Sequence, residues 1–265
     1  MAIEISKEYL KNLQYGTAKN LEARIQIHQR FSTNPEPFHA WIGNHMTFSG
    51  PVRVLEVGCG TGIFWRENLR RLAEGSSLVL TDFAEAMVAK TAQSFDQPWI
   101  RCELADMEAL AYPDASFDIV NAHHVMYHAA DKARAFAEIR RVLKPGGYLT
   151  LTTNSERHMR VVYDIGRQID PNFPTDRIID SFTEEVADIE VPKFFPKFEK
   201  FVQEDMLQVT DLEFLIDYVA SGVTPRGMKV ADDFYEKYAA IAKKEMDAKG
   251  YFEIPKRSAL FICHN

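Results

Sequence analysis

Short apolar runs alternate with longer amphipathic stretches along the chain from residue 52 onward. The runs are rich in valine, leucine and isoleucine, and we predict strands at 52–57, 77–82, 98–103, 117–122 and 147–153. Between them lie stretches with the period of a helix, at 62–73, 84–94 and 131–143. In the last of these, Phe136, Ile139 and Val142 recur at helical spacing. Strands that alternate with helices at this length predict a mostly parallel sheet with helices on both faces.

The chain on either side of this alternation predicts additional layers. The first 50 residues are typical of helices, which we expect near 4–14, 18–31 and 36–48. Beyond residue 155 we expect a helix at 157–169, an irregular aromatic and proline-containing stretch up to Pro196, a strand at 198–204, helices at 210–220 and 229–248, and a final strand at 258–263. The predicted fold is an α/β, Rossmann-like three-layer sandwich with a mostly parallel seven-stranded sheet. We expect a helical N-terminal cap (1–50) and a core (51–265), with an inserted lid at about 155–197 before the sixth strand.

The first predicted strand runs directly into the glycine-rich sequence Gly58-Cys59-Gly60-Thr61-Gly62. Glycine is needed where the backbone turns sharply or where a ligand approaches the main chain. A dinucleotide fingerprint would need a sixth-position glycine in place of Ile63, and a phosphate-binding Walker loop would need a lysine that this turn lacks. The glycines alone are compatible with a ligand-binding turn and with a purely structural tight turn.

Two aspartates follow the next two predicted strands. Asp82 ends the second strand, 20 residues after Gly62, and Asp106 follows the third. A carboxylate at the first of these positions can receive both hydroxyls of a ribose. Each aspartate by itself is more often a helix cap or a loop residue. Because the carboxyl ends of parallel strands meet at one edge of a sheet, the turn and the two acids together predict a nucleoside-binding pocket.

Three segments carry a family resemblance. The sequence Val54-Leu55-Glu56-Val57-Gly58-Cys59-Gly60-Thr61-Gly62 resembles the first motif of class I S-adenosylmethionine-dependent methyltransferases. Phe117-Asp118-Ile119-Val120 and Arg141-Val142-Leu143-Lys144-Pro145-Gly146-Gly147 resemble the fourth-strand and fifth-strand signatures of that family. The resemblance spans roughly residues 50–155, with the family's order and spacing.

The resemblance implies S-adenosyl-L-methionine as cofactor, S-adenosyl-L-homocysteine as product, and methyl transfer to an oxygen, nitrogen or carbon nucleophile of a small metabolite or natural product. Two alternatives stay open. One is an enzyme on the same fold that binds the cofactor without transferring its methyl group, such as a cyclase or decarboxylase. The other is a binding module without turnover, because the fold alone does not fix the reaction.

The resemblance also implies a role for individual residues. Glu56, Gly58 and Gly60 would lie under the methionine part, and Cys59 and Gly62 of the same turn are further cofactor-binding candidates. Asp82 would bind the ribose, and Phe83 and Met87 would lie against the adenine. Asp106 would hydrogen-bond the adenine amine with Met107 beside it, and His123 would contribute backbone contacts near the methionine amine. In related enzymes the N-terminal helices close over the cofactor. Tyr15, Arg24 and His28 are therefore candidates to meet the methionine carboxylate or the acceptor.

Two histidines after the fourth strand are candidates for a general base. His124 and His128 are four residues apart, which is a metal-ligand spacing on a helix, but position 125 is valine where a zinc peptidase has glutamate. We expect no metal site. An imidazole titrates in the range useful for accepting a proton from a hydroxyl or amine acceptor, and equally these side chains could form hydrogen bonds within the wall of the site.

Composition narrows the partners that we expect. The chain has 31 basic and 38 acidic residues, a formal charge of −7, and no extended basic tract, so we do not expect nucleic-acid binding. The three cysteines suggest neither a disulfide framework nor a zinc cluster. No apolar run approaches the roughly 20 residues of a membrane-spanning helix, and the first residues do not resemble a secretory signal. We expect a cytoplasmic protein, with monomer and homodimer both open.

Overall fold

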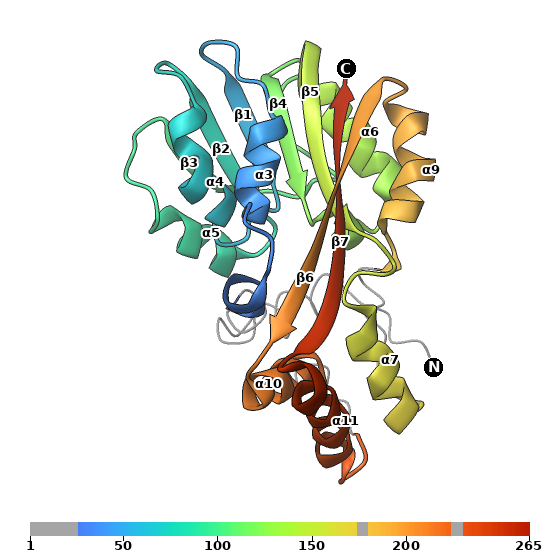
Figure 1. Cartoon of the computed structure of the whole chain (residues 1–265). Helices are drawn as coiled ribbons and strands as arrows, with labels where there is room; N and C mark the ends of the chain where they lie inside the picture. The colour runs from blue at the N-terminus through green and yellow to red at the C-terminus, as the bar shows by residue number, and fades with distance from the viewer. Residues whose placement is uncertain (1–25, 174–179, 224–229) are drawn as a thin grey trace. The chain divides into compact units, whose positions relative to one another are not determined.

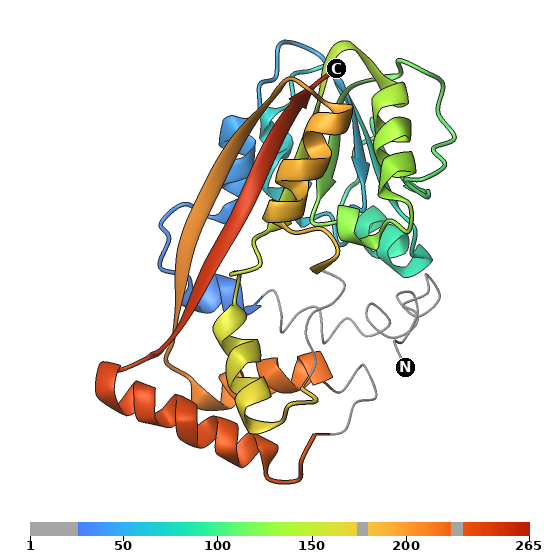
Figure 2. The same cartoon turned by 90° about the vertical axis from the view of Figure 1, so that its right-hand side faces the viewer.

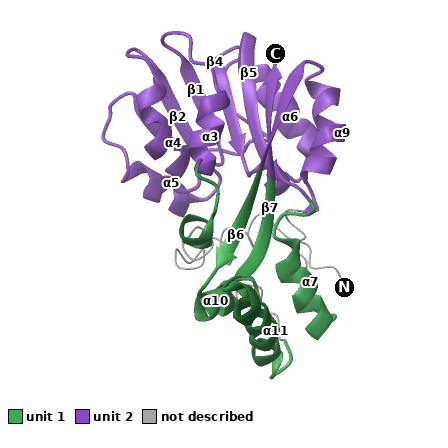
Figure 3. Cartoon of the chain, in the orientation of Figure 1, with its two compact units in different colours: residues 1–35, 156–177, 204–257 green, residues 36–155, 178–203, 258–265 purple. Residues whose placement is uncertain are grey.

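The computed structural model describes residues 26–173, 180–223 and 230–265 (Figure 1). The chain divides into two compact units, each made of segments that are not contiguous in sequence (Figure 3). The sheet unit comprises residues 36–155, 178–203 and 258–265, and the helical unit comprises residues 1–35, 156–177 and 204–257. The expected cap and lid stay predictions, because half of the cap (residues 1–25) lies outside the described residues.

The chain forms one seven-stranded sheet with the order β3-β2-β1-β4-β5-β7-β6. The strands are β1 (Arg53–Val57), β2 (Ser77–Asp82), β3 (Ile100–Leu104), β4 (Phe117–His123), β5 (Leu143–Asn154), β6 (Phe198–Val209) and β7 (Phe252–His264). Neighbouring strands from β3 to β5 pair in parallel, and β7 pairs with β5 in the antiparallel direction. The predicted α/β fold with a mostly parallel seven-stranded sheet is confirmed.

Helices cover both faces of the sheet unit. On one face, α3 (Phe38–His45) and α4 (Ile63–Asn68) with the 3₁₀ turn Leu69–Arg71 contribute Trp41 and Trp65 to an apolar cluster with Val54, Leu78 and Ile119. On the other face, α6 (Lys132–Val142) and α9 (Glu184–Phe194) pack against Leu55, Val120 and Leu149. Figure 2 shows these last two helices side by side on one face of the sheet. Helix α5 (Glu85–Ala92) contacts β2 and β3.

The predicted irregular stretch up to Pro196 is wrong, because it contains α9. The Thr183 hydroxyl caps this helix by accepting a hydrogen bond from the Val186 amide. The buried side chains of Ala187 and Val191 attach it to the core. Pro192 lies inside the helix although proline removes one helical hydrogen bond. The cap and the burial together outweigh this local penalty.

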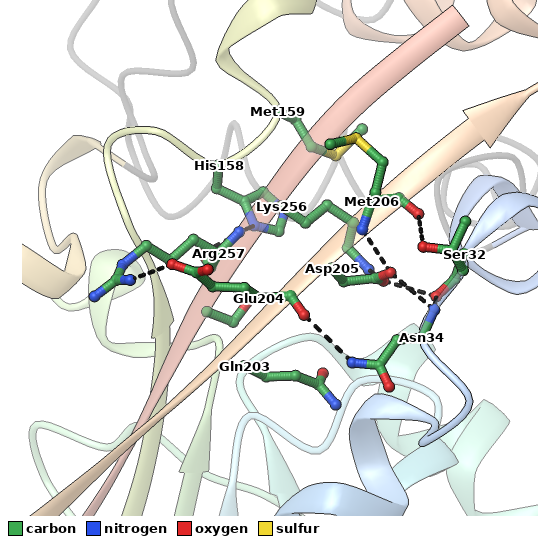
Figure 4. Close-up of polar contacts among 12 residues, drawn as sticks. Ser32, Asn34, His158, Met159, Gln203, Glu204, Asp205, Met206, Lys256 and Arg257 are labelled. Atoms are coloured by element: carbon green, nitrogen blue, oxygen red, sulfur yellow. Dashed lines mark hydrogen bonds and ion pairs between the residues drawn. The ribbon is translucent and has the colours of Figure 1, made fainter. Parts of the chain in front are cut away.

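The helical unit has an apolar core of its own. It is formed by α7 (Arg160–Ile169), α10 (Leu212–Val223) and α11 (Phe234–Lys249) with residues of β6 and β7. A short segment before the sheet unit is tied to β6: Ser32 pairs with Leu207 in an antiparallel bridge, and the Thr33 amide donates to the Met206 carbonyl at 2.9 Å. Figure 4 shows the polar contacts around this segment, with Asp205 at their centre.

Candidate functional site

The turn after β1 is built on three glycines in the left-handed backbone region. Gly58, Gly60 and Gly62 have φ values of +72°, +55° and +70°, which side chains with a Cβ rarely adopt. A Cβ added at Gly58 would lie 2.2 Å from the Val125 Cγ2 atom, so this glycine is required by packing. A Cβ added at Gly60 would meet no atom of the described residues within 4 Å. The Gly60 backbone is therefore open to close approach by a ligand.

Hydrogen bonds from neighbouring elements hold this turn. The Cys59 amide donates to the Thr81 carbonyl at the end of β2, at 2.8 Å. The Thr91 hydroxyl of α5 donates to the Gly60 carbonyl, also at 2.8 Å. Sequence reasoning missed Thr91. Its signal is a polar residue one helical turn after the buried Met87, on the inward face of α5.

Asp82 lies at the end of β2, directly beside the turn. Its carboxylate accepts hydrogen bonds from the Gly60 amide at 3.0 Å and from the Ala84 amide at 2.9 Å. The side chain is buried, and burial raises the pKa of this carboxyl above its ordinary value although the backbone N–H groups oppose the shift. The two backbone donors fix the carboxylate and leave lone pairs that can accept hydroxyl groups.

The second acid lies after the neighbouring strand. β2 and β3 pair in parallel with Asp82 opposite Leu104, and the half-buried Asp106 follows two residues later. The Asp106 side chain accepts from the Glu108 amide at 3.1 Å. Met87 and Met107 are buried, and Phe83 is half-buried. The ends of three adjacent strands thus carry the turn, Asp82 and Asp106, as the sequence predicts.

A buried polar pair lies at the ends of β1 and β4. The Glu56 side chain is 3% exposed and the His123 side chain 7%, and Glu56 Oε1 lies 3.8 Å from His123 Nδ1. Burial, with a contribution from Asp82, raises the pKa of Glu56 to about 8. Burial also holds the pKa of His123 well below its ordinary value, so this imidazole is neutral. Glu56 and His123 are therefore both buried, but the neutral imidazole supplies no positive charge to the carboxyl group.

His124 and His128 do not lie on one continuous helix. His124 has a φ of +50°, which is uncommon for a residue with a Cβ, and its amide donates to the Thr152 carbonyl at 3.0 Å. His128 ends the 3₁₀ turn Met126–His128, and its ring lies 6.3 Å from the Phe83 ring between centroids. Among residues 26–173, 180–223 and 230–265, no group of three or more His, Cys, Asp or Glu side chains is placed to hold a metal ion.

The N-terminal candidates fall elsewhere. Tyr15 and Arg24 lie outside the described residues. His28 belongs to the helical unit, where its ring lies 6.3 Å from the ring of His158. Every other candidate cofactor-binding residue belongs to the sheet unit.

The strand order, the glycine turn after β1 and the acids after β2 and β3 define a class of α/β protein that binds a nucleoside cofactor at the carboxyl edge of its sheet. Residues 55–151 match the family model of the methyltransferase domain. The chain carries a domain of the class I S-adenosylmethionine-dependent methyltransferase family, in which S-adenosylmethionine is the methyl donor.

Individual relatives of the matched stretch are also named methyltransferases. The malonyl-[acyl-carrier protein] O-methyltransferase of Halorhodospira halophila is 37% identical over 106 residues, which are 39% of this chain and 35% of that protein. The ubiquinone/menaquinone biosynthesis C-methyltransferase UbiE of Geobacter sulfurreducens is 36% identical over 118 residues, which are 42% of this chain and 46% of that protein. The matched stretch thus spans less than half the length of these curated relatives.

A solved structure shares the fold over nearly the whole chain. The phosphoethanolamine N-methyltransferase 2 of Haemonchus contortus, in complex with phosphomonomethylethanolamine and S-adenosylhomocysteine, is 16% identical with a TM-score of 0.59. The likeness covers 97% of this chain and 59% of that one. Within the part of this chain that the structure describes, no helix is both long enough and apolar enough to cross a membrane.

Proposed function

We propose that the chain transfers the methyl group of S-adenosylmethionine to an oxygen, nitrogen or carbon nucleophile of a small-molecule acceptor. One observation carries the proposal: the Asp82 carboxylate is held at 3.0 Å from the amide of Gly60, in a turn whose backbone is open to a ligand. Bare backbone and a fixed carboxylate at adjacent strand ends fit the amino-acid and ribose parts of one cofactor. The family match and the methyltransferase relatives support the same assignment.

The described residues fit the cofactor by their chemistry. We assign the ribose hydroxyls to Asp82, the adenine to Phe83, Met87, Asp106 and Met107, and the methionine part to Glu56, Gly58, Cys59, Gly60, Gly62 and His123, with Tyr15 and Arg24 as further candidates for its carboxylate. The buried polar atoms of Glu56 and His123 fit the charged end of the cofactor, because buried polar groups require partners.

The bound cofactor supplies a methyl group already activated by its sulfonium. The protein then has to align the acceptor with this methyl group and exclude water. Positioning alone can lower the activation barrier by about 7 kcal/mol. His128 and His124 are our candidates to accept the acceptor's proton when the acceptor is a hydroxyl or an amine. A carbon nucleophile that is already activated needs no such base.

Product analysis tests the proposal. The full chain is incubated with S-adenosylmethionine and a panel of small hydroxyl, amine and carbon acceptors, and mass spectrometry follows both products. We expect S-adenosylhomocysteine together with an acceptor that gains one methyl group. A product without that gain would assign the chain to cofactor-dependent chemistry such as cyclisation. Tight cofactor binding without any S-adenosylhomocysteine across the panel would favour a binding module.

A further inference from the structure

The connection between β3 and β4 is an irregular loop. Residues 105–116 form neither helix nor strand, and they connect two strands that have β2 and β1 between them in the sheet. A crossover between parallel strands usually contains a helix, which satisfies its own backbone hydrogen bonds. The backbone of this loop needs partners on neighbouring elements instead. Asp106, which we assign to the adenine, lies in this loop, so its position depends on those partners.

The first end of the loop is attached to β2. The Ala105 amide donates to the Asp82 carbonyl at 3.0 Å. The next residues form a closed turn, in which the Ala109 amide donates to the Asp106 carbonyl at 3.0 Å and the Glu108 amide donates to the Asp106 carboxylate at 3.1 Å. This turn fixes Asp106 relative to Ala109. The orientation of the turn as a whole then depends on what holds the residue after it.

Helix α6 holds that residue, Leu110. The Leu110 amide donates to Glu138 Oε2 at 2.8 Å, and the Leu110 carbonyl accepts from Arg141 Nη2 at 2.9 Å. Glu138 and Arg141 are three positions apart, so they lie on the same side of the helix. The Leu110 side chain is buried in the same apolar cluster as Ile139 and Val142 of α6. Backbone and side chain of Leu110 are therefore both attached to this helix.

Arg141 uses all of its donors in this contact. Two hydrogen bonds of 2.8 Å go to the two oxygens of the Glu138 carboxylate. The carbonyls of Leu110 and Tyr112 accept one each, at 2.9 and 2.7 Å, and the carboxylate of Asp114 accepts one at 2.8 Å. A guanidinium has five N–H donors in one rigid plane. Glu138 thus orients the plane, and the other donors of Arg141 hold the loop.

The two charged side chains are partly shielded from solvent. Arg141 is 30% and Glu138 20% exposed, whereas Asp114 is 79% exposed and should contribute little. The hydrogen bonds from Arg141 hold the pKa of Glu138 below its ordinary value, so the pair is ionised at neutral pH. Two charged side chains of one helix thus satisfy backbone groups of a loop that contains a candidate binding residue.

We propose that Arg141 and Glu138 are positioning residues for cofactor recognition, which hold the loop so that the Asp106 carboxylate meets the adenine amine. The inference rests on the proposed function, since it concerns the adenine end of the same cofactor. Both residues act through the backbone of Leu110 rather than by contact with the cofactor. Loss of either lowers the fraction of chains in which Asp106 is in place, and the contribution of the amine to affinity falls with that fraction.

Two ligands isolate the contribution of the adenine amine. S-Adenosylhomocysteine carries this amine, and its 6-deamino analogue has a hydrogen atom in that place. A hydrogen bond from the amine to a carboxylate should give the wild-type chain a roughly ten- to hundredfold preference for S-adenosylhomocysteine in titration calorimetry. Asp106→Ala should remove most of this preference.

The variant Arg141→Met removes the guanidinium and keeps a side chain of similar length. We expect the preference to fall to about threefold or less, because Asp106 is no longer held at the amine. Circular dichroism checks that the variant is folded. A role in folding alone would lower the melting temperature and leave the preference unchanged. In a chain that already carries Asp106→Ala, Arg141→Met should not change the preference further.

Arg140 provides the matched control on the same helix. Its guanidinium donates to the Phe194 carbonyl at 3.1 Å and to Asn265 Oδ1 at 3.2 Å, both outside the loop. Arg140→Met should keep the wild-type preference. An equal loss of preference in Arg140→Met and Arg141→Met would mean that the preference depends on α6 in general, and it would overturn the inference.

Hydrogen exchange follows the loop directly. Arg141→Met should speed exchange at residues 106–112, while the amides of β1 and β2 keep their protection. Glu138→Gln is the second variant, because it keeps the size of the side chain and removes the charge that orients Arg141. It should change the preference and the exchange in the same direction, which keeps the inference testable even if Arg141→Met does not fold.

The possible failures can be told apart. A wild-type preference in both Arg141→Met and Glu138→Gln would overturn the inference and leave the proposed function intact. Equal binding of the two ligands by the wild-type chain would remove Asp106 from the amine and the inference with it, again without affecting the proposed function. If the folded wild-type chain does not bind S-adenosylhomocysteine, the proposed function itself fails.

Discussion

Gly60 lies where a ligand would have to come closest to the backbone. Its φ of +55° would cost a residue with a Cβ roughly 1–2 kcal/mol. An added Cβ would also lie more than 4 Å from every atom in the part of the chain that the structure describes. We expect Gly60→Val to fold, as circular dichroism would show, and to lose S-adenosylhomocysteine binding in calorimetry, because the branched side chain blocks the approach.

Gly146 provides the control for this substitution. It also has a positive φ, of +78°, and also has open space around its Cβ position, but it lies near the start of β5. Gly146→Val should carry a comparable backbone penalty and keep the wild-type affinity. Unchanged affinity in Gly60→Val would show that the turn does not touch the cofactor.

Asp82 gives a second prediction on this scale. A hydrogen bond to a charged group contributes about 1.5–3 kcal/mol, so Asp82→Ala should weaken S-adenosylhomocysteine binding by roughly ten- to a hundredfold. 5′-Methylthioadenosine has the same adenosyl group as S-adenosylhomocysteine but lacks the amino acid. Because the two ligands share the ribose, Asp82→Ala should weaken the binding of 5′-methylthioadenosine by the same factor. The exposed Asp96 supplies the control variant Asp96→Ala, with no expected change. A loss confined to S-adenosylhomocysteine would argue against a ribose role.

Residues of the site differ in how far the sequence alone could reveal them. The glycines and Asp82 were predictable, because a left-handed turn or a charged group at a strand end restricts the residue type. Thr91 and Thr150 were not. Thr91 meets Gly60, 31 positions away, and Thr150 meets Asn121, 29 positions away. A buried threonine has no local pattern that distinguishes it from its neighbours in a strand or helix.

The sequence pattern predicted where each strand of the sheet lies, but not the residues at which β5 and β7 begin. β2 matches its predicted range, but β5 begins at Leu143 and β7 at Phe252, several residues before the predicted starts. The sequence Lys144-Pro145-Gly146-Gly147 is typical of a break. The sheet instead absorbs it by a register shift, since Phe117 pairs with Leu143 and Ile119 with Tyr148. Tertiary pairing thus overrides the local signal.

The anchoring of the segment before the sheet unit gives a prediction at this scale. In the helical unit, Lys256 Nζ lies 2.7 Å from Asp205 Oδ2, and Asp205 also accepts from the Ser32 hydroxyl at 2.7 Å and from the Asn34 amide at 3.1 Å (Figure 4). Both residues are half-buried, and their side chains are 12% and 5% exposed. Lys256→Met would leave a largely shielded carboxylate without its cation. We expect a loss of about 3 kcal/mol of unfolding free energy in urea titrations.

The pH dependence of this loss has a definite sign. Burial acts to raise the pKa of Asp205, but the hydrogen bonds from Lys256 and Ser32 outweigh it and leave the pKa below its ordinary value. A depressed pKa stabilises the fold above about pH 4, and this contribution disappears as the pH falls through the folded-state value. The difference between wild type and Lys256→Met should therefore be largest near neutral pH and shrink in acid.

The neighbouring residue on β7 is the control. Arg257 pairs with Glu204, whose side chain is 73% exposed, and exposed pairs contribute at most about 1 kcal/mol. Arg257→Met should change stability by no more than that. If Lys256→Met and Arg257→Met lose the same amount of unfolding free energy, the low exposure of the Lys256–Asp205 pair does not determine how much the pair stabilises the fold.

At the scale of the whole molecule, the grouping of segments is the feature that local patterns do not encode. Residues 1–35, 156–177 and 204–257 share one unit although long stretches of sequence separate them. Periodicity reports which face of a strand or helix is buried, but not which distant segment buries it. The sheet order, in contrast, was within reach, because alternating strands and helices restrict the topology to a few right-handed arrangements.

The grouping of the segments determines where a bound ligand should stabilise the chain. A ligand that binds only the folded state stabilises it by about 2.7 kcal/mol at a hundredfold excess over its Kd. The turn, Asp82 and Asp106 all lie in the sheet unit. Hydrogen exchange with 5′-methylthioadenosine should therefore show new protection at residues 56–62, 82–87 and 104–107. S-Adenosylhomocysteine should add protection around Tyr15 and Arg24 if these residues meet its carboxylate, as the family resemblance implies. Identical maps for the two ligands would remove both residues from the site, and protection confined to residues 204–257 would contradict the site as a whole.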